Sequence, residues 1–408
     1  MRLPPMIASL TRHKLTVLLM LLATAFTSAI ITNIASMVAH RLELLNAPSG
    51  IDESSIVLID STWIKTAQFG SSKSDRDFWP EYQADLHALR GIADVESAAA
   101  VNGMPFWGGS SVGVGVTVDD VANAPVYVSA FMGGPATIRT LGLKLVEGRN
   151  FSRTDYVRGG PEKVAATIIS RALAQRLFHT SHAVGRLIYT HAPQPMRVVG
   201  VVAHLINTSP GLGAADNEYA MLWPAEPGGD SVTFALRTTP AERAQVLKRA
   251  VALLTKRNPH RIFQDARTFT QMRAEYFRRY SSMVSLLLAT GFGLLLVTAA
   301  GMAGLTSFWV QQRTRSIGIR RALGATRVDI LRYTHLENFL IVTVGILLGC
   351  VLAYGLNLQL MKYYALQTLP SSYLVIGAVA LWLMGQLAVL APSLRAGAVP
   401  PAVATRSG

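Results

Sequence analysis

A serine between glycines is the first candidate for chemistry in this chain. Residues 109–113 read Gly-Ser-Ser-Val-Gly and match the G-x-S-x-G pattern, in which a strained strand-to-helix turn exposes a nucleophilic serine. Such a turn needs a strand before the serine and a helix after it. Here a glycine-rich stretch leads into a strand pattern at 112–118. A nucleophilic role for Ser111 is therefore disfavoured, and we assign no catalytic residue.

The second candidate is a pair of histidines. His179 and His182 lie three residues apart near the end of a predicted helix, a spacing that some metal sites use. No nearby acid or cysteine completes a ligand set, and Cys350, the only cysteine, lies in a hydrophobic stretch. We therefore predict surface or loop positions for the histidines, no metal site, and no disulfide within the chain.

Nucleotide hydrolysis would need a glycine-rich loop that ends in Gly-Lys followed by Ser or Thr. The backbone amides of such a loop hold the phosphates, and its lysine meets their charge. The dipeptide Gly-Lys does not occur in the 408 residues. We therefore expect the chain not to be an enzyme and to bind no cofactor itself, so any ATP-driven work depends on a separate subunit.

The most informative segment is 311–336, a basic stretch between two long uncharged ones. It carries six arginines against one acid, Asp329, so the positive-inside rule places it in the cytoplasm. Gly324 can end one helix in a left-handed conformation, and Thr326 with Asp329 three residues later reads as the N-cap and N3 of another. We predict a tight corner between two short helices at 324–326; the alternative is an ordinary charged loop.

The composition indicates a membrane protein with a sizeable aqueous domain. Hydrophobic residues make up 50% of the chain and charged residues 15%, and the net charge is +14. Residues 1–39, 311–338 and 393–408 together hold eleven Lys and Arg against two acids, so most of the basic excess flanks the hydrophobic stretches. The charge is thus a topology signal and an attraction to lipid headgroups, and we predict no nucleic-acid partner.

Four uncharged stretches are long enough to cross a membrane: 15–39, 281–310, 339–360 and 372–394. The charge bias then places residues 1–14, the basic segment 311–338 and the tail 395–408 inside, and the large region 40–280 outside. A cleaved signal peptide is the alternative for the first stretch. If residues 268–310 form one helix, it is about 64 Å long, roughly twice the hydrocarbon thickness of a bilayer.

The outside region has an α/β pattern. Strand, helix and strand follow one another at 54–60, 82–89 and 95–101, and again at 231–237, 241–254 and 261–263. We predict one βαβ subdomain formed from two halves, 54–105 and 225–267, with a β-rich insertion at 106–224 and a stalk helix at 268–280. Strands of the insertion are expected at 112–118, 126–131, 143–151, 166–170, 196–202 and 219–223, with short helices at 135–141 and through 178.

The third hydrophobic stretch contains a G-x-x-x-G pattern formed by Gly345 and Gly349. Glycines at this spacing let helix backbones approach closely in lipid, where the hydrophobic effect does not drive association. We expect these glycines to pack within the chain's own bundle, and a dimer contact is the alternative.

The run from Arg315 to Thr326 resembles a known signature. It is similar to the cytoplasmic segment of FtsX-like and MacB-like permeases, the membrane subunits of one class of ABC system, and departs from it at Ser316, where that family usually has an acid. Residues 141–151, 172–178 and 198–202 are similar to recurring segments of the MacB-like periplasmic domain. Their order makes the likeness span nearly the whole chain.

The resemblance implies an α/β membrane protein with four transmembrane helices and a large periplasmic α/β domain between helices 1 and 2. It implies a cytoplasmic ATPase that binds ATP and Mg and pushes on the basic segment, and a second permease copy or related permease. A periplasmic adaptor and an outer-membrane channel are further partners that this interpretation allows. The residues to which it assigns coupling are Arg315, Ile317, Gly318, Arg320, Arg321, Ala322, Leu323, Gly324, Ala325, Thr326 and Asp329.

Three functions follow as hypotheses. The first is a permease of the cell inner membrane that exports or handles an amphiphilic substrate, such as a peptide, macrolide or lipoprotein, by mechanotransmission. The second is an FtsX-like regulator that transmits ATPase motion to a cell-wall hydrolase or a sensor kinase. The third is a membrane-anchored hydrolase through Ser111. The size of the outside domain favours the first.

Overall fold

The computed structural model describes residues 14–63, 78–107, 112–118, 124–157, 163–190, 194–211, 216–225, 231–364 and 371–397. The chain forms two compact units. One is the α/β unit, Leu44–Arg279, and the other is the helical unit, made of Met1–Glu43 and Tyr280–Gly408. This division agrees with the predicted α/β membrane protein.

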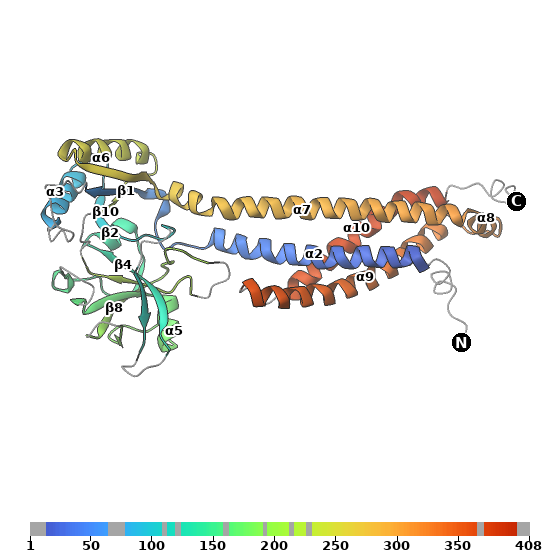
Figure 1. The fold of residues 1–408 in the computed structure, drawn as a ribbon, viewed down its shortest axis with the longest axis horizontal. Helices are drawn as coiled ribbons and strands as arrows, with labels where there is room; N and C mark the ends of the chain where they lie inside the picture. Colours follow the sequence, from blue (N-terminus) through green and yellow to red (C-terminus); the bar gives the residue numbers. More distant parts are fainter. Residues whose placement is uncertain are drawn as a thin grey trace. The chain divides into compact units, whose positions relative to one another are not determined.

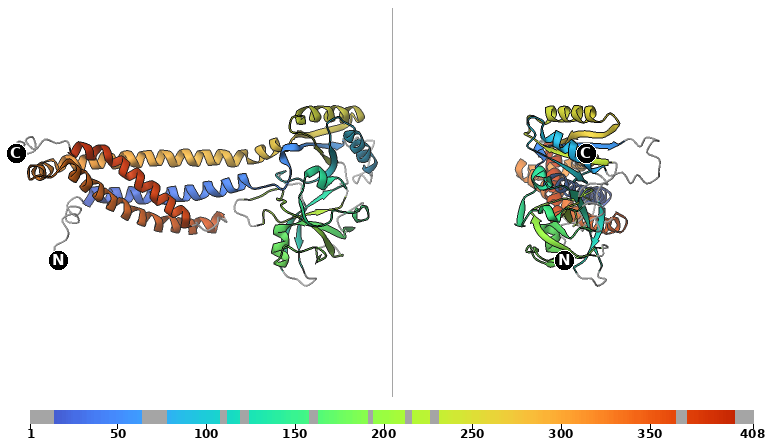
Figure 2. Two further views of the ribbon diagram at one scale, coloured as in Figure 1. Left: turned by 180° about the vertical axis from the view of Figure 1, so that it is seen from behind. Right: turned by 90° about the vertical axis from the view of Figure 1, so that its left-hand side faces the viewer.

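The helical unit is made of all or most of four long helices: α2 (Lys14–Asn46), α7 (Phe269–Gln312), α9 (Arg327–Tyr364) and α10 (Ser371–Gly397). Each is long and apolar enough to cross a membrane. They lie side by side in both Figure 1 and Figure 2. Their shared core contains Met20, Met302, Trp309, Ile341, Val342, Ile346 and Leu381. The four predicted spans are therefore confirmed as helices, and α7 is one continuous helix of 44 residues.

The α/β unit begins and ends with two βαβ units that interleave. The first is β1 (Ile56–Trp63), α3 (Trp79–Arg90) and β2 (Ser97–Asn102); the second is β10 (Ser231–Arg237), α6 (Arg243–Arg257) and β11 (Arg261–Thr268). The strand order is β11-β1-β10-β2, and every neighbouring pair is antiparallel. This arrangement is the split βαβ motif, in which each unit's parallel strands are separated by a strand of the other.

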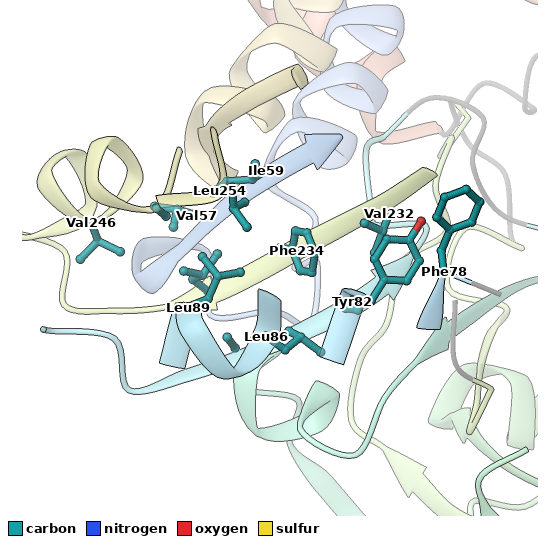
Figure 3. Packing of buried hydrophobic residues seen from close by; sticks show 14 of the residues in the cluster. Val57, Ile59, Phe78, Tyr82, Leu86, Leu89, Val232, Phe234, Val246 and Leu254 are labelled. Atoms are coloured by element: carbon teal, nitrogen blue, oxygen red, sulfur yellow. The ribbon is translucent and has the colours of Figure 1, made fainter. Parts of the chain in front are cut away.

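Helices α3 and α6 cover one face of these strands (Figure 1). Figure 3 shows Leu86 and Leu89 of α3 and Leu254 of α6 gathered with Val57 and Phe234 of the sheet. All five side chains are buried, because alternate residues of each strand point to this face and the helices present their apolar sides to it. This is the core of the first subdomain.

The segment between β2 and β10 extends the same sheet and has a core of its own. Its order continues β4-β9-β6-β8-β5, with β3 on β4 and β7 on β8. Two pairings in it are parallel, β4 with β9 and β6 with β8. Its elements are β3 (Val112–Val116), β4 (Val126–Gly133), α4 (Thr137–Leu141), β5 (Leu145–Gly148), β6 (Ala166–Ser170), α5 (Arg171–Phe178), β7 (Leu187–Ile188), β8 (Met196–Val202) and β9 (Ala220–Trp223).

Several predicted element boundaries were wrong, and three of them have a clear physical cause. The strand expected at 143–151 is only Leu145–Gly148, since Gly148 has a positive φ of 77° and ends the extended backbone. Residues 53–55, partly included in the first predicted strand, form a short 3-10 helix. The strand expected at 261–263 continues to Thr268, because β1 pairs with β11 along the whole length of β11. The polar residues of β11 after Phe263 concealed this extension in the sequence.

Candidate coupling site

The predicted corner is present and both of its ends are capped. Helix α8 (Thr314–Ala322) ends where Gly324 adopts a φ of +101°. The Gly324 amide donates to the Arg321 carbonyl and the Ala325 amide to the Arg320 carbonyl, each over 3.1 Å. These two bonds form a Schellman motif, which satisfies carbonyls that have no partner inside the helix. The Gly324 conformation expected from the sequence is therefore confirmed.

The next helix, α9, begins with a reciprocal cap. The Thr326 amide donates to Asp329 Oδ2 over 2.9 Å, and the Asp329 amide donates to Thr326 Oγ1 over 3.2 Å. The Thr326 hydroxyl donates to the same carboxylate over 2.6 Å. This is a capping box with aspartate at N3, as the spacing predicted. Because both helix ends are satisfied locally, the corner has a defined shape.

The tip of the corner is apolar and exposed. Leu323 is 84% exposed, Val328 57% and Ile319 47%. Arginines 315, 320, 327 and 332 of the same two helices are also exposed. One of them, Arg320, lies over the Tyr333 ring at 4.9 Å from its centroid. Exposed apolar side chains and exposed cations on one short segment match the composition of a protein-binding surface, which combines apolar contacts with polar groups.

Not every predicted coupling residue lies on this surface. Gly318 is buried, and Ile317, Arg321 and Ala325 are half-buried, so they shape the corner from within. The remaining members, Arg315, Arg320, Ala322, Leu323, Gly324, Thr326 and Asp329, are exposed. The exposed set forms the candidate contact surface.

Two residues outside the predicted set hold the base of the corner. Arg313, between α7 and α8, lies 3.3 Å from both oxygens of Glu337, whose side chain is only 3% exposed. Its guanidinium also lies 4.3 Å from the centroid of the Trp309 ring. This ion pair, with its acid buried, links α9 to the end of α7. In the sequence, the sign of this pair was Glu337, an acid that lies two residues before an apolar span and therefore needs a partner.

The G-x-x-x-G glycines of α9 face α2 within the helical unit. A Cβ on Gly345 would lie 2.7 Å from Cβ of Thr24, and one on Gly349 would lie 2.4 Å from Cβ of Ser28. No side chain fits at either position without a shift, so the two backbones approach closely.

The other candidates gain no support as sites. Ser111 lies outside the described residues. His179 ends α5 at a φ of +56°, and His182 Nδ1 lies 3.5 Å from a Glu147 oxygen. Within the part of the chain that the structure describes, no three His, Cys, Asp or Glu side chains could hold a metal ion.

Comparison with known proteins defines the class. Residues 15–253 match the MacB-like periplasmic core domain, and residues 288–401 match the FtsX-like permease C-terminal domain. The chain belongs to the MacB-like family of ABC transporter permeases. It is a multi-pass membrane protein with an extracellular domain.

Two relatives give the range of similarity. The macrolide export ATP-binding/permease protein MacB of Chromobacterium violaceum is 30% identical over 247 residues, which cover 58% of this chain and 36% of the relative. The ABC transporter permease YknZ of Bacillus subtilis is 25% identical over 269 residues, 65% of this chain and 66% of the relative. The aligned parts thus cover less than two thirds of either relative.

Among solved structures, the chain is similar to the periplasmic region of MacB from Actinobacillus actinomycetemcomitans. It is 14% identical, covers 55% of this chain and 94% of its own, and has a TM-score of 0.34.

Proposed function

We propose that this chain is the permease subunit of an ABC-type transporter in the cell inner membrane. In this proposal a separate cytoplasmic ATPase binds ATP and Mg, docks on the corner at 319–328 and moves it. The motion passes along the helices to the outside domain, which handles or exports an amphiphilic substrate. Two permease copies, or this chain and a related permease, would receive two ATPases.

The observation that carries the proposal is the doubly capped corner with its exposed apolar tip. A passive loop between spans needs neither a Schellman motif nor a capping box, whereas a surface that receives force needs a fixed shape. Leu323, at 84% exposure, has no role in the chain's own core and is suited to insert into a groove of a partner.

Export is the favoured activity because the relative from Chromobacterium violaceum is named as a macrolide exporter. Macrolides are largely apolar molecules with polar groups, which agrees with an amphiphilic substrate. The separate ATPase is supported by the absence of Gly-Lys from these 408 residues. The permease YknZ, whose name mentions no ATP-binding part, supports the same division of labour.

The test is substitution of Gly324. A Cβ there meets nothing within 4 Å, so a substitution acts only through the backbone conformation. A β-branched residue resists the left-handed region by about 1–2 kcal/mol, whereas asparagine tolerates it better. The full-length chain is assembled with the ATPase that co-purifies with it. We expect the wild-type chain to stimulate ATP hydrolysis by that ATPase and Gly324→Val to remove this stimulation. Gly324→Asn should keep most of it.

The controls separate assembly from coupling. Membrane insertion of the Gly324→Val protein and its ATPase binding should equal those of the wild type, since residues 323–326 belong to none of the hydrophobic cores described above. The chain without ATPase should hydrolyse ATP no faster than buffer. Full stimulation by Gly324→Val, with normal ATPase binding, would show that force enters elsewhere.

A further inference from the structure

The first three turns of α7 carry a buried stripe. Phe269, Met272 and Phe277 are 0%, 3% and 4% exposed, and they belong to the α/β unit that ends at Arg279. Their spacing of three and five residues, with Arg273 and Tyr276 between them, places them on one face of the helix. Part of the segment predicted as a stalk helix is therefore packed into the interior of the α/β unit, which is called the outer domain below.

Arg273 lies at the centre of this stripe and holds the end of α2. Its Nη2 donates to the carbonyls of Leu45, over 2.6 Å, and Ala47, over 2.8 Å. Carbonyls at a helix C-terminus have no partner inside the helix and carry partial negative charge, so a guanidinium there satisfies and stabilises them. Its Nη1 pairs with the carboxylate of Glu53, and both side chains are mostly buried. One side chain of α7 thus fastens the last turn of α2.

The same guanidinium contacts the loop that follows β2. It lies 4.9 Å from the centroid of the Phe106 ring, within the range of cation–π attraction. Phe106 is 2% exposed and has a φ of +64°, a conformation that a bulky residue adopts only when its surroundings impose it. Its ring lies 5.1 Å from Phe277 and 5.6 Å from Tyr276, between centroids. Packing against α7 therefore holds this loop in a strained shape.

These contacts reach both parallel strands of the first βαβ unit. Glu53 lies three residues before β1, and Phe106 lies four residues after β2. Arg273 touches both segments and the end of α2 as well. A displacement of α7 along its axis would act on β1 and β2 together.

We propose that Arg273 is the positioning residue through which movement of α7 enters the outer domain. It locks α2 to α7 and passes their displacement to β1 and to the loop at Phe106. The passing of movement from α7 to β1 and to the loop at Phe106, called transmission below, rests on the proposed function, because it requires an ATPase that moves the helices. The fastening of α2 to α7 by Arg273, called the lock below, does not require an ATPase. Lysine cannot replace arginine fully, because one ammonium group lacks the planar fork that reaches a carboxylate and two carbonyls at once.

The first experiment tests the lock without any ATPase. Backbone hydrogen exchange is measured on the full-length chain in lipid nanodiscs. Arg273→Met should exchange faster than wild type at residues 45–55 and 103–107 and equally in α9 and α10, and Arg273→Lys should lie between. The matched control is Arg278→Met, whose side chain is 72% exposed and pairs with Glu275 on the same helix. It should behave as wild type. Unchanged exchange of both Arg273 variants would refute the lock.

The second experiment tests transmission in the complex with the co-purified ATPase. In the wild type, adding ATP should change the exchange rate at residues 103–107; in Arg273→Met this difference should be lost while ATPase binding is retained. If Arg273→Met fails to fold, Arg273→Lys is used instead. Its ATP-dependent change in exchange rate at residues 103–107 should be smaller than that of the wild type. A full ATP-dependent difference in the Arg273 variants overturns the proposal. A wild-type chain that binds no ATPase overturns the proposed function and the transmission, and the first experiment still decides the lock.

Discussion

Asp155 shows how a single residue makes stability of the outer domain depend on pH. Arg149 lies 2.7 Å from its carboxylate, and the amide and hydroxyl of Ser152 each donate to it over 2.7 Å. The hydrogen bond from Arg149, followed by those from Ser152, lowers the pKa of Asp155 to about 2. A carboxyl group with a lowered pKa stabilises the fold above its unfolded pKa of about 4, and this contribution is lost as pH falls toward 2.

We therefore expect Asp155→Asn to lower the stability of the outer domain by about 1 kcal/mol near neutral pH. This free-energy difference is smaller than the lowered pKa alone would give, because Arg149 is exposed and solvent screens its charge. Calorimetry of the full chain in detergent micelles at several pH values measures the effect. The wild-type and variant midpoints should converge as pH falls from about 4 toward 2. A difference that does not change with pH would contradict this account of Asp155.

Among single residues, those whose partners are close in sequence could be predicted. Gly324, Thr326 and Asp329 form their caps within a few positions of one another, so the amino-acid types alone indicated the corner. Arg273 could not be assigned a role, because its partners lie near residues 45, 53 and 106. In the sequence it was only an arginine too polar for the lipid interior.

At the scale of elements, the close approach of α9 and α2 is the feature that a substitution tests best. A Cβ on Gly349 would lie 2.7 Å from the Ala25 carbonyl oxygen as well as 2.4 Å from Ser28, so the backbones must separate. Overpacking of this kind costs about 1–3 kcal/mol. Gly349→Leu should therefore lower the thermal midpoint of the purified full chain.

Gly355 is the matched control for Gly349. It lies on the same helix, and a Cβ there meets nothing within 4 Å. Gly355→Leu should leave the thermal midpoint of the full chain unchanged. For both variants the midpoint is measured in detergent as the temperature at which half of the monodisperse protein is lost. Equal midpoints for the two variants would mean that α9 does not pack on α2 through Gly349.

Secondary structure could be predicted better than its arrangement. Strands at 166–170, 196–202 and 231–237 occur with the predicted bounds, because β-branched residues between turn signals mark them. The two βαβ halves were also visible in the pattern. Their interleaving was not, because the antiparallel pairing of β1 with β10 joins residues about 180 positions apart, and no local signal encodes it.

At the scale of the whole molecule, the proposed function requires that one chain connects the two sides of a membrane. The basic corner must lie in the cytoplasm, where ATP is available, and the α/β unit must lie outside. Arginine distribution and four apolar helices argue for this topology. The family match supports an extracellular domain but does not itself place the corner.

The most direct measurement is the accessibility of single cysteines in intact spheroplasts. Cys350 is first replaced by alanine so that each variant carries one thiol. Ser231→Cys, at an exposed position of the α/β unit, should react with a membrane-impermeant maleimide; Ser316→Cys, at an exposed position of α8, should react only after the membrane is permeabilised. Labelling of Ser316→Cys in intact spheroplasts, with or without labelling of Ser231→Cys, would contradict the account.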